Sequence, residues 1–324
     1  MKPLRMPAII CAGLLVFSGC SSPQPSPPWP ATVKFPPSPP PFAAATGKSW
    51  HLAYDEDFAG NALDLTKVSP CADWWYGGVG QCATGSINNG REQMVQKSAS
   101  EGQVTVHDGR ATITAQPQGP PAGNCPYYGG ENACNYKSGM LSTARPSAYN
   151  NAYPYVYKFT YGYAEARIKL PTTRGFFSAF WMLDAANGAP YQWETDIFEI
   201  LGGHPQTSYM QTSWPPNRAG SYRPNSTGDL TADNAACPVK DYSTDWHTWA
   251  IDWQPDHIAW RIDGQECARL NGSAGTNIPN VPMFLMINLM VDTGWQRDAA
   301  LTCGDTCTAI DTLNIDYLRV WQQS

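Results

Sequence analysis

The sequence predicts an all-β fold in which two antiparallel sheets pack as a sandwich, in the manner of a β-jelly roll. Polar and apolar residues alternate in many short segments, and an Asp-Gly pair ends two of them. No long segment keeps the 3.6-residue period of a helix. The same aromatic-rich, weakly charged texture runs from residue 49 to residue 324, a length that suits one large domain.

The chain begins with a segment typical of bacterial export signals. Lys2 and Arg5 precede an apolar run that is too short to cross a bilayer but suits a signal-peptide core. Small residues then precede Cys20, a pattern that resembles the lipobox, whose cysteine is lipidated. We expect residues 1–19 to be a lipoprotein-type signal peptide and Cys20 to carry a lipid anchor to a membrane. The alternative is an ordinary cleaved secretion signal.

A proline-rich stretch follows, and we expect residues 20–47 to be an extended tether, because proline fixes φ and lacks a backbone donor. Residues 48–324 would then form the folded domain. These features predict an exported protein, either a cell-envelope lipoprotein or a secreted one. The net charge of −6 and the absence of a block of basic residues argue against a nucleic-acid partner. We expect a monomer.

Eight cysteines follow the leader, and an even number in an exported chain predicts disulfides. Their spacing does not match a paired zinc site. Cys125–Cys134 and Cys303–Cys307 are candidate local pairs, and the full pairing stays open.

Alternation predicts the strands. Asp108-Gly109 and Asp263-Gly264 are hairpin turns. The segment 282–291 is almost entirely apolar, as in a strand covered on both faces. In chain order, the predicted strands are residues 104–106, 111–115, 163–170, 258–262, 282–291 and 313–321.

The most informative segment places Glu194, Asp196 and Glu199 in an otherwise apolar strand. Burying charge is costly unless a site uses it, so a functional role is favoured over a solvated surface strand. Glu194 and Asp196 share one face, whereas strict alternation turns Glu199 to the other. A β-bulge between Asp196 and Glu199 would return it to the first face.

Three carboxyl groups on one face suit the cleavage of glycosidic bonds with retention of configuration. That reaction needs a carboxylate nucleophile and a carboxylic acid about 5–5.5 Å apart. Crowded like charges and partial burial drive the pKa values of such groups apart. A third carboxyl between them can share a proton and orient the nucleophile.

The acidic segment resembles the Glu-x-Asp-x-x-Glu signature of glycoside hydrolase family 16, in the bulged branch that includes laminarinases, agarases and κ-carrageenases. Other blocks resemble the family along nearly the whole domain. They are Tyr54–Gly60, Phe159–Pro171, Ala179–Leu183, Trp246–Trp253, Ile287–Leu289 and Asp316–Val320.

The resemblance implies a concanavalin-like jelly roll with a substrate cleft across its concave face. It implies that Glu194 is the nucleophile, Asp196 the assisting acid and Glu199 the general acid/base. No cofactor is required. A structural Ca²⁺ on the convex side is allowed, with Asp316 in a position to supply one ligand.

The same resemblance implies a retaining, endo-acting hydrolase of β-linked polysaccharide, with β-1,3- or β-1,3-1,4-glucan favoured. Thr195 replaces the usual aliphatic residue after the nucleophile, and the loop after the Asn288 strand also departs from the family, so the sugar stays open. The alternatives are a galactan-cutting, agarase-like hydrolase, a transglycosylase and, from another class, a carbohydrate-binding surface lipoprotein. Retention of all three acids favours an enzyme.

Sugar rings stack on aromatic side chains, so some tryptophans are candidate substrate platforms. Trp193 and Trp295 flank motifs that border the cleft in family members, and Trp181 is a candidate for the cleft floor. Asn288 could donate a hydrogen bond to a sugar hydroxyl or satisfy backbone groups. The other strand tryptophans are expected to be packing residues: Trp249, Trp253 and Trp260.

Overall fold

The computed structural model describes most of the chain after residue 35. The described residues are 36–72, 79–84, 90–118, 134–145, 153–185, 193–206, 208–214, 223–229, 236–238, 240–292, 302–304 and 307–324. They belong to one compact unit, and all their regular elements are strands. Within this part of the chain, no helix is long and apolar enough to cross a membrane.

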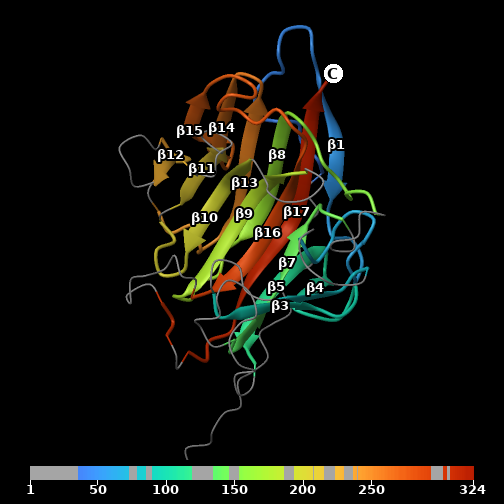
Figure 1. Cartoon of the computed structure of the whole chain (residues 1–324), viewed down its shortest axis with the longest axis vertical. Coiled ribbons are helices and arrows are strands. Elements are labelled where there is room, and N and C mark those ends of the chain that lie inside the picture. Colours follow the sequence, from blue (N-terminus) through green and yellow to red (C-terminus); the bar gives the residue numbers. More distant parts are fainter. Residues whose placement is uncertain are drawn as a thin grey trace, which may run out of the picture. The chain divides into compact units, whose positions relative to one another are not determined.

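Eleven described strands form the larger sheet (Figure 1). Nine follow one path, while β1 (Trp50–Glu56) pairs with β17 and β4 (Val104–His107) pairs with β5. The path runs β15 (Gln265–Asn271), β14 (His257–Ile262), β13 (Trp246–Gln254), β8 (Gly162–Lys169), β17 (Asp311–Gln323), β5 (Arg110–Pro117), β6 (Tyr136–Ser138), β3 (Glu92–Gln96) and β2 (Cys82–Thr84).

Six described strands form the smaller sheet, which carries the acidic segment on β10. Their order is β12 (Arg223–Asp229), β11 (Tyr209–Trp214), β10 (Glu194–Leu201), β9 (Phe176–Asp184), β16 (Met283–Val291) and β7 (Met140–Ser142).

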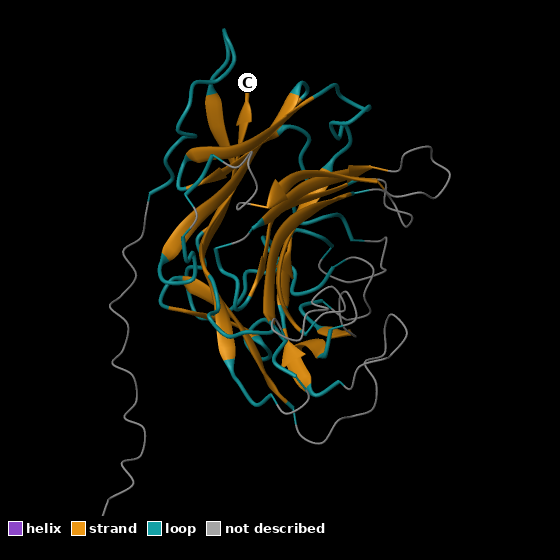
Figure 2. Ribbon diagram, turned by 90° about the vertical axis from the view of Figure 1, so that its left-hand side faces the viewer, coloured by secondary structure: helices purple, strands orange, loops and turns teal. Residues whose placement is uncertain are grey.

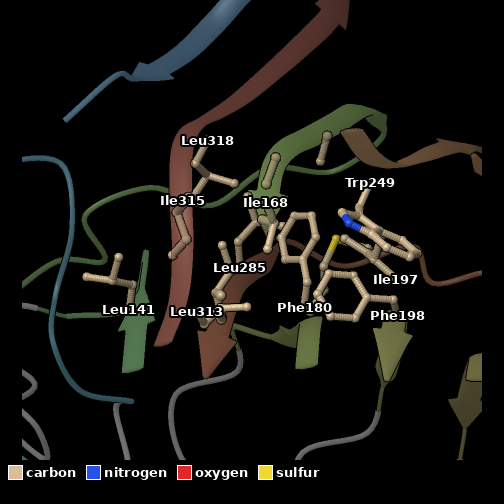
Figure 3. Packing of buried hydrophobic residues seen from close by; sticks show 14 of the residues in the cluster. Leu141, Ile168, Phe180, Ile197, Phe198, Trp249, Leu285, Leu313, Ile315 and Leu318 are labelled. Carbon is tan, nitrogen blue, oxygen red and sulfur yellow. The ribbon is translucent and has the colours of Figure 1, made fainter. Parts of the chain in front are cut away.

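The two sheets stack face to face with curved strands, and the main core fills the space between them (Figure 2). Phe180 of β9 and Leu285 of β16 meet Ile168 of β8 and Ile315 of β17 in this layer (Figure 3). A second apolar cluster, which includes Phe177, packs on the opposite face of the smaller sheet. All nine residues of β16 are buried, because both of its faces are covered.

The predicted sandwich is confirmed, and each predicted strand coincides with an observed one, extending past it by at most one residue. Asp108-Gly109 and Asp263-Gly264 form the expected hairpin turns, with positive φ at both residues of each pair, a conformation in which glycine is unstrained. One pairing departs from the antiparallel expectation, since β3 and β6 run parallel.

The end of the expected tether packs against the larger sheet. The Phe42 ring makes edge contacts with Trp50 and Tyr163, and Arg261 lies over it. The Trp50 indole donates a hydrogen bond to the Phe42 carbonyl, and the Ala45 amide donates one to Gln323. The expectation of an extended spacer up to residue 47 is therefore wrong for this part, because Phe42 gives it an aromatic anchor. Cys20 and the signal segment lie outside the described residues.

Three disulfides join described cysteines: Cys71–Cys82, Cys237–Cys267 and Cys303–Cys307. The last of these was predicted. Cys134 is also disulfide-bonded, while its predicted partner, Cys125, lies outside the described residues.

Candidate active site

Strand β10 contains the predicted bulge. Its register shifts between Asp196 and Glu199 against β11, and between Asp196 and Phe198 against β9. Ile197 and Phe198 are therefore both buried in the main core, although they are adjacent in sequence. The extra interior residue returns Glu199 to the face that carries Glu194 and Asp196.

The three acids line one hollow on the outer face of the smaller sheet. The cross-strand register places Trp181 opposite Asp196 and Ala179 opposite Glu199. On the next strand, β16, Asn288 lies opposite Ala179. The hollow is lined by Ala179, Trp181, Glu194, Asp196, Glu199, Asn288 and Met290.

The environment favours protonated carboxyl groups. Burial raises the pKa of Glu199 to about 8, with an added contribution from the nearby Glu194 carboxyl. Burial likewise raises the pKa of Asp196 well above its ordinary value, as do Glu199 and Glu194, while a hydrogen bond with Gln211 acts in the opposite direction. The hollow can therefore hold protons near neutral pH.

Two polar atoms beside the hollow lack a hydrogen-bond partner among the described residues. The Trp181 indole donates a 2.7 Å hydrogen bond to Asn288 Oδ1, which orients the amide. Asn288 Nδ2 and Asp196 Oδ2 are buried and have no hydrogen-bond partner among the described residues. Buried polar groups are normally paired, so these two atoms mark the hollow as a candidate site.

The structure brings together five of the predicted site residues: Glu194, Asp196, Glu199, Trp181 and Asn288. Trp193 is a correction, because its side chain is only 7% exposed and belongs to the main core, where it offers little ring face to a sugar. Trp295 lies outside the described residues. Trp249, Trp253 and Trp260 are fully buried, as expected.

The residues around Asp316 do not fit a Ca²⁺ site. Asp316 Oδ2 accepts a 2.8 Å hydrogen bond from the guanidinium of Arg167, so a cation already faces this carboxylate. In the described ranges, no group of three or more His, Cys, Asp or Glu residues could hold a metal ion. The ligand role of Asp316 stays a prediction that this ion pair does not favour.

Two apolar residues of the hollow, Ala179 and Met290, were not anticipated. Met290 stands two positions after Asn288 on β16, so the alternation of a strand places both on one face. That spacing was the available signal. It was hidden because β16 is apolar at every position except Asn288.

The family comparison agrees with this geometry. A model described as "Glycosyl hydrolases family 16" matches residues 95–318, more than half of the chain. The chain belongs to glycosyl hydrolase family 16. The match contains the bulged strand and β16, and therefore all the acids of the hollow.

Two curated relatives of this family 16 chain have low sequence identity to it. It is 28% identical over 254 residues to the endo-1,3-1,4-beta-glycanase ExsH of Rhizobium meliloti. That alignment covers 76% of this chain and 46% of ExsH. It is 25% identical over 295 residues to the glucan endo-1,3-beta-glucosidase A1 of Niallia circulans, covering 84% and 38%. The chain thus spans less than half the length of these two relatives.

Among solved structures, the laminarinase from Rhodothermus marinus superimposes with a TM-score of 0.61 at 22% identity. The match covers 86% of this chain and 99% of that one. At this identity the likeness shows the fold alone, and it confirms the jelly-roll sandwich.

Proposed function

We propose that this chain is an endo-acting glycoside hydrolase that cleaves β-linked polysaccharide with retention of configuration. One observation carries the proposal: a bulged strand presents Glu194, Asp196 and Glu199 to a single hollow. Retaining hydrolysis uses two carboxyl groups in different protonation states.

In the first step, a Glu194 oxygen attacks the anomeric carbon while Glu199 gives its proton to the glycosidic oxygen. The bond between the anomeric carbon and that oxygen breaks, and a glycosyl ester forms on Glu194. Glu199, now a carboxylate, then takes a proton from water. The water oxygen attacks the anomeric carbon and frees Glu194, so two inversions give net retention.

The raised pKa of Glu199 supports its role as the acid, because it keeps the proton near neutral pH. Asp196 lies between the two glutamates in sequence, shares their face and has a raised pKa of its own. Before the glycosyl ester forms, Asp196 would share a proton with Glu194 and so orient the Glu194 carboxylate for attack.

The favoured substrate is a β-1,3- or β-1,3-1,4-glucan. The names of the two curated relatives support this choice, since one is a 1,3-1,4-glycanase and the other an endo-1,3-glucosidase. Sequence departures beside the site leave agarase-like galactan cleavage, transglycosylation and a non-catalytic carbohydrate-binding role as outcomes of the test.

The test measures new reducing ends after the domain is incubated with laminarin, lichenan, agarose, carrageenan and arabinogalactan. Glu194→Gln and Glu199→Gln are expected to lower turnover by at least about a thousandfold. Glu165→Gln is the matched control: this half-buried carboxyl accepts hydrogen bonds from Tyr163 and Tyr317, outside the hollow. Wild-type activity that survives both site variants would overturn the proposal, as would folded wild-type protein that binds a glycan without cutting it.

We also propose that the protein is exported and anchored through Cys20. The lipobox-like sequence supports this, and the disulfides fit an oxidising compartment. Cys20→Ser should abolish labelling of the chain with a radioactive fatty acid. Equal labelling of both forms would contradict the anchor.

A further inference from the structure

A tryptophan of the larger sheet reaches the catalytic strand of the smaller one. Trp260 lies on β14, is fully buried and belongs to the main core. Its indole Nε1 donates a 2.8 Å hydrogen bond to the main-chain oxygen of Asp196 on β10. The bond therefore crosses the sandwich and joins the two sheets.

The acceptor stands at the edge of the bulge. Asp196 is the last residue of β10 in regular register with both neighbouring strands before the shift. A bulge disrupts the ladder locally and leaves its extra residue unpaired. Buried backbone groups need partners, so a donor at this carbonyl stabilises the bulged conformation against a regular register.

Side-chain packing from the larger sheet also holds the bulged segment of β10. The bulge turns Phe198 into the core, where its ring centroid lies 4.6 Å from that of Trp249 on β13 (Figure 3). Ile197 is buried beside it. The larger sheet thus contacts the bulge twice, through the Trp249 ring and through the Trp260 hydrogen bond.

The bulge determines where the Asp196 and Glu199 carboxyl groups lie. A strand that returned to strict alternation would turn Glu199 away from Glu194 and Asp196. We propose that Trp260 is a positioning residue for the proposed hydrolysis: its indole N–H fixes the bulge that places Asp196 and Glu199 in one hollow. This inference rests on the proposed function and deepens it, since Trp260 touches no reacting atom.

The chain offers a matched control in Trp253. It also lies on the larger sheet, is fully buried, and donates from Nε1 to a buried main-chain oxygen, that of Pro279, at 3.0 Å. Trp253→Phe therefore removes the same kind of hydrogen bond and the same ring volume, away from β10. A general loss of core stability would affect both variants alike.

The experiment compares kcat, KM and the pH profile of Trp260→Phe and Trp253→Phe on the polymer that the wild type cleaves. We expect Trp260→Phe to lower kcat about tenfold or more while KM stays within about twofold, because misplaced catalytic groups slow the chemical step. Trp253→Phe should keep both constants within about twofold of the wild type.

Protonation gives a second readout that needs no turnover. Among the described residues that line the hollow, the titratable groups facing Glu199 are Glu194 and Asp196. Turning Glu199 away from Glu194 and out of its partly buried position should lower its pKa by about half a unit or more. Carbon-13 NMR of selectively labelled glutamate carboxyl groups follows that titration in the wild type and in both variants.

If Trp260→Phe does not fold, 3-benzothienylalanine at position 260 is the second variant. It keeps the shape of the indole and replaces only the N–H with sulfur. A lowered kcat and a lowered Glu199 pKa in either Trp260 variant, with neither change in Trp253→Phe, support the inference. Equal behaviour of the Trp260 and Trp253 variants overturns it. An inactive wild type contradicts the proposed function instead, and the carboxyl titration still decides the positioning role.

Discussion

Glu199 lies on the same face of the smaller sheet as Glu194, although the two residues are an odd number of positions apart on β10. Regular alternation would place them on opposite faces. The bulge at Ile197 and Phe198 removes that conflict by turning two consecutive side chains into the core. One local irregularity therefore assembles the candidate active site, and the predictions below follow from it.

The pH dependence of turnover should show an alkaline limb set by Glu199. Its pKa is raised to about 8, and the proposed general acid must carry its proton. We expect kcat to be high near neutral pH and to fall about tenfold per pH unit as the pH rises beyond that pKa. Initial rates measured across the pH range give this profile, and circular dichroism shows whether the domain stays folded at each pH. A limb centred below pH 6 would contradict the assignment.

The same raised pKa makes Glu199 a source of instability at high pH. The folded state binds its proton more tightly than the unfolded chain, whose glutamate pKa is about 4.3, so stability falls as the pH rises between these values. Glu199→Gln removes this loss. We expect its Tm to exceed that of the wild type by at least about 2 °C at pH 8 and by much less at pH 4. A difference independent of pH would exclude the linkage.

Thr195, the departure from the family pattern, should be coupled to Thr212. Their hydroxyl groups lie 2.9 Å apart between β10 and β11, and both residues are fully buried. Thr195→Val or Thr212→Val alone leaves a hydroxyl without this partner, at a cost of about 1–3 kcal/mol. The double variant should be more stable than the sum of the single losses implies. Urea unfolding of the wild type, both single variants and the double variant gives a double-mutant cycle. Additive losses of unfolding free energy would show that the pair is not coupled.

The aromatic anchor upstream of β1 should stabilise the domain without affecting catalysis. Phe42→Ala removes contacts with Trp50, Tyr163 and Arg261, and we expect it to lower the free energy of unfolding by about 1–3 kcal/mol. Pro37→Ala, at an exposed neighbouring position, is the control. Chemical denaturation measures both. Equal stabilities would show that the domain begins after this segment.

Much of this architecture is predictable because alternation reports directly which face of a strand is buried. β8 follows that pattern over most of its length, and the bulge on β10 was predictable because three acids in an apolar strand require a common face. β16 was identified as a covered strand, but a run that is apolar apart from Asn288 does not show which of its apolar residues face the hollow. Met290 was missed for that reason.

Other features depend on contacts between segments distant in sequence. Trp193 precedes the catalytic strand, yet only the packed structure shows that its ring belongs to the core. Arg167 and Asp316 are 149 residues apart in sequence but pair across adjacent strands, so only the structure shows a cation beside this candidate metal ligand. The anchoring of Phe42 was hidden by the composition of its neighbours, which is typical of a flexible linker.

The most direct test of the central claim is the configuration of the first product. Proton NMR of the anomeric signals, recorded within minutes of mixing the domain with the polymer that it cleaves, distinguishes the two outcomes before mutarotation. Retaining hydrolysis through Glu194 and Glu199 predicts that the β-anomer of the new reducing end appears first. If the α-anomer appears first, the bond is broken with inversion, and the proposed roles of the two glutamates are wrong.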